Sequence, residues 1–138
     1  MFKRILIAYD GSEPADKAFD YAVDLTSKYQ SSLDVLAIAR PPDFAEDVET
    51  EALLERMQEQ FQDQFAQLRL RAAKCGVTPD FNILVGHPAE QIVREAEEKS
   101  VDLILVGHRG KGLFERWLLG SVSRVVIAYA HCAVIVVR

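Results

Sequence analysis

The chain contains 138 residues, with a mass of 15.5 kDa and a formal net charge of −5 at pH 7. This length accommodates one domain, which we assign to residues 1–138, and excludes a two-domain enzyme with a separate cofactor module. Because 49% of the residues are apolar and 27% are charged, the chain can bury a substantial core, which excludes disordered and fibrous classes. The acidic balance argues against nucleic acid and anionic membranes as partners.

The charge is unevenly distributed along the chain. Residues 1–42 carry a net charge of −1, residues 43–98 carry −8 and residues 99–138 carry +4. A basic region is therefore predicted late in an otherwise acidic chain, where it can attract an anionic ligand.

The cysteines and the first residues indicate the compartment. Cys75 and Cys132 are far apart and show no CxxC spacing, which suggests neither a disulfide framework nor a zinc site. The first apolar run meets Asp10 after a length too short for a signal peptide, and no segment approaches the length of a membrane span. We therefore expect a cytoplasmic protein without membrane association.

The hydrophobic pattern alternates between strands and helices. Apolar residues on consecutive positions predict strands, and apolar residues at three- and four-residue spacing predict helices with one buried face. In chain order the pattern predicts a strand at 5–9, a helix burying Ala15, Ala18, Ala22, Leu25 and Tyr29, a strand at 33–39, and a helix burying Leu54, Met57, Phe61, Phe65, Leu68 and Ala72. It then predicts a strand at 81–85, a helix after His87 with Pro88 in its first turn and Ile92, Val93 and Ala96 buried, a strand at 103–106, a helix from about Ser121 to Tyr129, and a strand at 133–137.

This alternation predicts an α/β fold of the doubly wound, Rossmann-like class. Consecutive apolar residues are typical of parallel strands buried on both faces, and right-handed crossovers place helices on both faces of the sheet. We expect five parallel strands in the order 3-2-1-4-5. A ligand in such a fold lies beyond the carboxyl ends of the strands at the point where strand order reverses, so the residues after the first and fourth strands matter most.

The segment 107–123 carries the clearest functional signal. Glycines at 107, 110 and 112 allow close approach of a ligand and positive φ, and Gly120 with Ser121 opens a helix whose N–H groups favour an anion. Basic residues and serine hydroxyls add charge and donors, so the combination suits a polyphosphate. A Walker A loop is excluded because Gly112 follows Gly110-Lys111, and a GxGxxG loop is excluded because Glu115 occupies the position of the third glycine.

The same segment resembles the universal stress proteins of the A-like superfamily, whose ATP-binding members carry Gly-x2-Gly-x9-Gly-[Ser/Thr]. Gly107, Gly110, Gly120 and Ser121 match this spacing without a gap. The resemblance extends over the whole chain, from the first strand and its Asp-Gly-Ser turn to the last strand. One departure is Ala133, where the family usually has proline before that strand.

The resemblance implies ATP as the ligand, with any Mg²⁺ held by phosphate oxygens and water rather than by a protein ligand set. It also implies a homodimer that pairs the last strands of two subunits; the run 133–137 is apolar and lacks a proline or charge to protect a sheet edge. The implied site contains Asp10 and the backbone of Ile38 on the ribose and adenine side, Gly107, Arg109 and Gly110 along the phosphates, and Gly120, Ser121, Val122 and Ser123 at the far phosphate groups.

Structural roles remain as alternatives for several of these residues. Gly107 can simply end a strand, Ser121 can cap a helix, and Asp10 can bind the turn that follows it or cap the first helix. His108 can contact phosphate or be an idle surface histidine. The three histidines share no ligand spacing, which argues against a transition-metal site.

The implied function is an adenine-nucleotide-binding stress-response protein that acts as a sensor or adaptor. No nucleophile elbow or well-placed general base is present, so at most slow hydrolysis or phosphate transfer to Ser121 or Ser123 is expected. A nucleotide-free interaction module of the same fold is the main alternative. A receiver domain is disfavoured because the third strand ends without an aspartate, and a flavin carrier because the first turn lacks a hydroxyl-rich phosphate loop.

Overall fold

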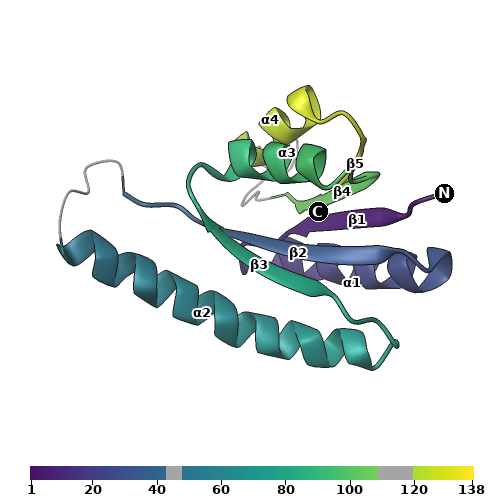
Figure 1. Cartoon of the computed structure of the whole chain (residues 1–138), viewed down its shortest axis with the longest axis horizontal. Helices are drawn as coiled ribbons and strands as arrows, with labels where there is room; N and C mark the ends of the chain where they lie inside the picture. Colours follow the sequence, from purple (N-terminus) through teal and green to yellow (C-terminus); the bar gives the residue numbers. More distant parts are fainter. Residues whose placement is uncertain (43–47, 109–119) are drawn as a thin grey trace.

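The computed structural model describes residues 1–42, 48–108 and 120–138, and it contains one five-stranded parallel sheet with helices on both faces (Figure 1). The strand order is β3-β2-β1-β4-β5, so the predicted doubly wound α/β fold is confirmed. The elements are β1 (Arg4–Ala8), α1 (Glu13–Tyr29), β2 (Ser32–Ala39), α2 (Val48–Ala73), β3 (Asp80–Val85), α3 (Pro88–Glu98), β4 (Leu103–Gly107), α4 (Ser121–Tyr129) and β5 (Ala133–Val137).

The sheet separates two apolar layers. Ile5 and Ile7 of β1 pack with α1 and α2, whereas Leu6 between them packs with α3 and α4 on the other face. All three side chains are almost completely buried, which explains why the central strands are apolar on consecutive positions. The reversal of strand order between β1 and β4 places the crevice for a ligand at the carboxyl ends of these two strands.

Helix α1 begins with a well-formed cap. Ser12 is the N-cap, its Oγ accepts a hydrogen bond from the Ala15 N–H at 3.2 Å, and Pro14 lies in the first turn. The buried stripe differs from the predicted one, because Phe19, Val23 and Thr26 join its alanines. Leu25 is only partly buried and Tyr29 is exposed, where its ring meets Phe2 edge-on with centroids 5.5 Å apart.

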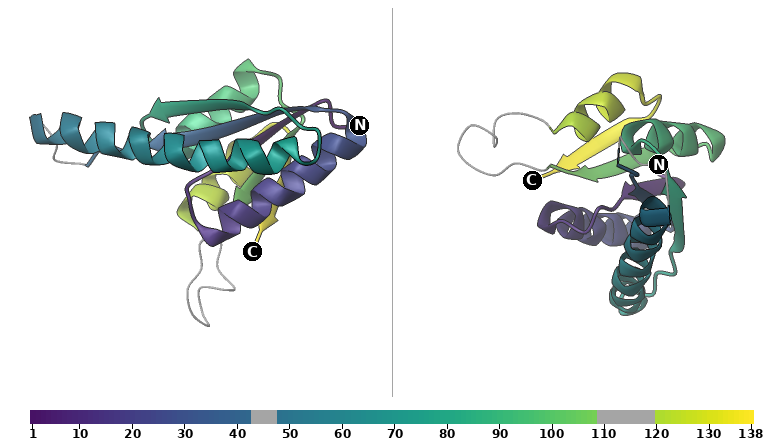
Figure 2. Two further views of the ribbon diagram at one scale, coloured as in Figure 1. Left: turned by 90° about the horizontal axis from the view of Figure 1, so that it is seen from below. Right: turned by 90° about the vertical axis from the view of Figure 1, so that its left-hand side faces the viewer.

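Helix α2 spans 26 residues and extends past the sheet at its N-terminal end (Figure 2). Only its second half joins the core, where it buries Phe61, Phe65, Leu68 and Ala72. Leu54 and Met57, predicted as core, are only partly buried.

Helices α3 and α4 cover the opposite face. Pro88 starts α3 as predicted, and the helix buries Ile92 and Ala96, while Val93 packs at the margin of the core. Helix α4 buries Ser123 and Val126. Ala133 begins β5, so the departure from the family pattern lies at the start of that strand.

Candidate functional site

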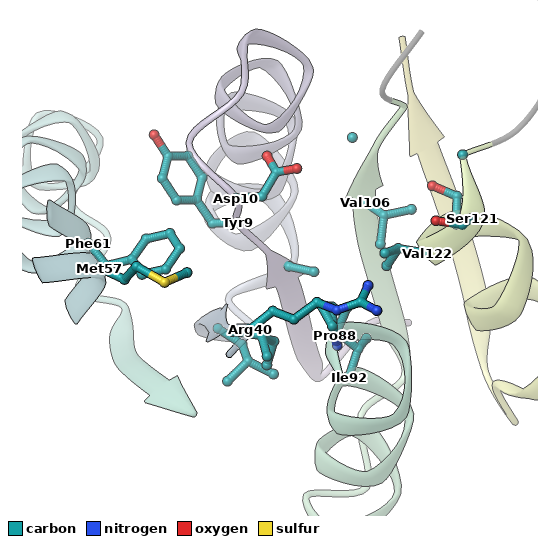
Figure 3. Close-up of a pocket in the computed structure, with 16 residues that line it drawn as sticks. Tyr9, Asp10, Arg40, Met57, Phe61, Pro88, Ile92, Val106, Ser121 and Val122 are labelled. Carbon is teal, nitrogen blue, oxygen red and sulfur yellow. The ribbon is translucent and has the colours of Figure 1, made fainter. Parts of the chain in front are cut away.

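A cavity of about 460 Å³ opens at the carboxyl ends of β1, β2 and β4, where the topology predicted a ligand (Figure 3). Of the nine predicted site residues, Arg109 and Gly110 lie outside the described residues. The other seven all line this cavity: Asp10, Ile38, Gly107, Gly120, Ser121, Val122 and Ser123.

The N-terminus of α4 forms one wall of the cavity. Gly120 is its N-cap with φ −62° and ψ 159°, and no side-chain cap hydrogen bond satisfies the first turn among the residues that the structure describes. The first N–H groups of a helix have no partner within the helix, and they carry the positive end of its dipole. Ser121, Val122 and Ser123 therefore present a set of donors suited to an anion such as phosphate.

Asp10 follows β1 and lines the cavity near α1. Its Oδ1 accepts hydrogen bonds from the N–H of Ser12 at 3.0 Å and from the Ser12 hydroxyl at 2.5 Å. Gly11 between them has φ +81°, a left-handed conformation that glycine adopts easily. The structural role considered for Asp10 is therefore present, and it also fixes the carboxylate at the cavity.

Gly107 ends β4 without a positive φ, which differs from the sequence expectation. A Cβ added here would lie 2.6 Å from the Ala15 nitrogen and 2.7 Å from the Pro14 carbonyl carbon. The glycine is thus needed for the close approach of β4 to the first turn of α1. This contact also brings Gly107 and the Asp10 turn to the same cavity.

A family model described as the Universal stress protein family matches residues 1–138. The chain belongs to this family. It is 33% identical over 141 residues to universal stress protein MJ0531 of Methanocaldococcus jannaschii, covering 100% of this chain and 83% of that protein. The family resemblance inferred from the glycine spacing is confirmed.

Solved structures agree with this assignment. Universal stress protein UspA from Lactobacillus plantarum matches with a TM-score of 0.89 at 26% identity, over 99% of this chain and 98% of that one. A universal stress protein in complex with cAMP has a TM-score of 0.69 at 24% identity, covering 99% and 97% of the two chains. Another, from Archaeoglobus fulgidus in complex with dAMP, has a TM-score of 0.71 at 21% identity, covering 99% and 98%. At these lower identities the likeness to the two complexes shows a shared fold.

Tyr9 lines the cavity next to Asp10 (Figure 3). Its phenol donates a hydrogen bond to Asp16 Oδ1 at 2.9 Å, and Arg71 of α2 pairs with Asp16 at 3.3 Å and with Asp20. Burial, followed by the hydrogen bond to Asp16, raises the pKa of Tyr9 well above its usual range, so the phenol remains a donor at neutral pH. This network joins α1 to α2 beside the cavity.

His108 is 4% exposed, so the expectation of an idle surface histidine is wrong. The backbone N–H of His108 donates a hydrogen bond to the Val137 carbonyl at 2.7 Å, which continues the pairing of β4 with β5.

Several cavity residues were not identified from the sequence as ligand residues. Arg40 was treated as part of a linker, and Met57 and Phe61 were predicted only as core. Their common signal is position: each comes from the end of β2 or from the helix that follows it. The cavity is lined in addition by Ala8, Tyr9, Leu36, Pro88, Ile92 and Val106.

The described residues do not form a metal centre of their own. No group of three or more His, Cys, Asp or Glu side chains that could hold a metal ion occurs within 1–42, 48–108 and 120–138. In the same ranges, none of the helices combines the length and the apolarity that crossing a bilayer requires.

Proposed function

We propose that this protein binds ATP in the cavity at the carboxyl edge of the sheet and acts as a nucleotide-dependent sensor or adaptor in the stress response. The observation that carries the proposal is the uncapped first turn of α4 facing Asp10 and Ile38 across one cavity. Two universal stress proteins of the same fold were solved in complex with cAMP and with dAMP, which supports an adenine nucleotide as the ligand class.

The cavity offers a separate contact for each part of ATP. The N–H groups of Ser121, Val122 and Ser123 would hold phosphate oxygens, with Gly120 leaving room for close approach. The Asp10 carboxylate can accept hydrogen bonds from ribose hydroxyls, and the backbone of Ile38 can pair with the adenine edge. A Mg²⁺ ion would enter with the nucleotide, bound through phosphate oxygens and water, because this donor set is made of N–H and hydroxyl groups.

The residues that line the cavity are suited to binding a nucleotide rather than to hydrolysing it. The described lining residues include one carboxylate, Asp10, whose Oδ1 already accepts two hydrogen bonds from Ser12. Rapid hydrolysis needs a base that activates water, so we propose at most slow hydrolysis or phosphate transfer to Ser121 or Ser123. Retention of bound nucleotide suits a sensor, whose partner reads the loaded state.

The proposal includes a homodimer in the cytoplasm. Strand β5 lies at one edge of the sheet, and Val134, Ile135 and Val136 are only partly buried. Pairing of β5 across a twofold axis would satisfy the backbone groups of this edge and cover these side chains. The two free cysteines suit a reducing compartment.

Ligand identity and thermal stability test the proposal. Mass spectrometry of ligand released from the denatured, purified protein should detect an adenine nucleotide. A ligand that binds only the native state stabilises it, by about 2.7 kcal/mol at a concentration of 100 Kd, so MgATP should raise the melting temperature. GTP and flavin mononucleotide serve as comparison ligands. If neither released nucleotide nor a shift with millimolar MgATP is found, the nucleotide-free interaction module is the better function.

A further inference from the structure

One face of α2 passes from the core into the cavity. Phe65, Phe61 and Met57 follow one another at four-residue spacing, so their side chains share a face of the helix. Phe65 is 1% exposed and belongs to the core, Phe61 lies at the core boundary, and Met57 is only partly buried beyond it. Phe61 and Met57 line the cavity, and Figure 3 shows them on the opposite side from Ser121 and Val122.

The aromatic part of this face is held in position. The Phe61 ring stacks on Phe65 with centroids 6.3 Å apart and 26° between the planes. Phe65 contacts Phe81 at 4.8 Å and Tyr9 at 6.5 Å between centroids. Because Phe65 is anchored by rings from β3 and the end of β1, the position of Phe61 is fixed before a ligand binds.

The cavity therefore has two chemically different sides. The α4 side presents N–H groups and serine hydroxyls, whereas the α2 side presents a phenyl ring and a thioether. Contact with apolar side chains does not stabilise a bound phosphate. A planar aromatic ring is stabilised by the phenyl ring, on which it can stack, and by the thioether, because methionine sulfur contacts ring edges favourably.

We infer that Met57 and Phe61 form a base-binding wall that makes the site selective for ligands carrying a planar aromatic base over phosphates alone. This inference rests on the proposed nucleotide function and extends it to a helix that the glycine motif does not include. Ile38 near the end of β2 would meet the edge of the base, and the α2 wall would cover its face.

Binding of three probes to matched variants tests the wall. The probes are ATP, adenosine, which has a base without phosphates, and inorganic tripolyphosphate, which has phosphates without a base. Met57→Ala shortens the wall, and Leu53→Ala is the control, because Leu53 lies four residues earlier on the same face, is 37% exposed and does not line the cavity. Phe61→Leu is a second variant that keeps apolar volume but loses the ring. Isothermal titration calorimetry of each folded variant gives the Kd values.

Loss of a stacked ring weakens base binding by roughly 5- to 150-fold, and loss of a sulfur–ring contact weakens it by roughly 2- to 13-fold. We expect about a tenfold loss for Met57→Ala or Phe61→Leu with ATP and adenosine, little change with tripolyphosphate, and none in Leu53→Ala. Three results would contradict the base-binding wall but not the nucleotide site. The wall variants could lose as much affinity for tripolyphosphate as for ATP, Leu53→Ala could lose as much affinity for ATP as the wall variants, or both wall variants could bind ATP and adenosine with unchanged affinity. Failure of the proposed function itself would be seen separately, as absence of ATP binding by the wild-type protein.

Discussion

Replacement of Gly107 by alanine tests the contact that joins the phosphate side of the cavity to α1. The added Cβ would lie 2.6, 2.7 and 3.0 Å from the Ala15 nitrogen, the Pro14 carbonyl carbon and the Ala15 Cα. All three are backbone atoms, so no side chain can rotate to relieve the contact. The capped turn at Ser12 fixes the start of α1, and the Gly107–Val137 register fixes the end of β4.

Overpacking against rigid backbone costs typically 1–3 kcal/mol, and we expect about 2 kcal/mol or more for Gly107→Ala. In a domain of this size, 1 kcal/mol corresponds to roughly 4 °C in melting temperature, so a decrease of about 8 °C is expected. Urea unfolding monitored by circular dichroism gives the free energy directly. A larger side chain should cost more, so Gly107→Asn should be less stable than Gly107→Ala.

Gly76 supplies the control, because it has φ +72° and nothing within 4 Å of an added Cβ. There the cost of alanine comes from left-handed backbone, which asparagine tolerates better, so Gly76→Asn should be more stable than Gly76→Ala. A loss below about 1 kcal/mol in Gly107→Ala, or the same Ala and Asn ranking at both glycines, would refute the crowding argument.

Three further variants test other parts of the molecule. Gly120→Val should abolish ATP binding in a titration while the circular dichroism spectrum is unchanged, because valine adopts the extended N-cap conformation but fills the space beside the phosphate donors; undiminished affinity would remove the phosphate site. Wild-type protein should scatter light with about twice the mass of 15.5 kDa, and Val136→Lys should reduce it to the monomer mass; a wild-type monomer at all concentrations would contradict pairing through β5. The backbone N–H groups of Arg4 and Lys3 donate to Asp102 Oδ2 and lower its pKa. The ionised carboxylate therefore stabilises the fold fully above the unfolded-state pKa of about 4, and this stabilisation is lost progressively as the pH falls from there through the lower folded-state pKa. The difference in melting temperature between wild type and Asp102→Asn should therefore shrink as the pH falls below about 4, and a constant difference would show that the carboxylate charge has no such role.

The sequence by itself determined the fold class, because the signals that define it are local. Consecutive apolar residues in five short runs indicate buried parallel strands, and three- and four-residue spacing indicates the helices between them. The glycine and serine spacing from Gly107 to Ser121 determined the family in the same way, and the family model confirms it. Topology then predicts that Asp10 and the start of α4 lie at one edge of the sheet, where both line the cavity.

The tertiary structure decided everything that depends on which surface a side chain faces. Leu54 and Met57 continue the apolar spacing of Phe61 and Phe65, but the N-terminal end of α2 extends past the sheet. Both residues are therefore only partly buried, and Met57 lines the cavity instead. The spacing of residues along a helix records which side chains share a face, and it contains no information on how far the opposing sheet extends.

Gly107 and His108 are two single residues whose surroundings could not be predicted from the local sequence. The glycine was interpreted through a ligand, yet the atoms nearest its missing Cβ belong to Pro14 and Ala15, which are distant in sequence. His108 is buried by β5, which follows it only after another helix. Local sequence determines which backbone conformations are favourable, whereas the neighbours that make a glycine necessary or bury a histidine exist only after distant segments have packed together.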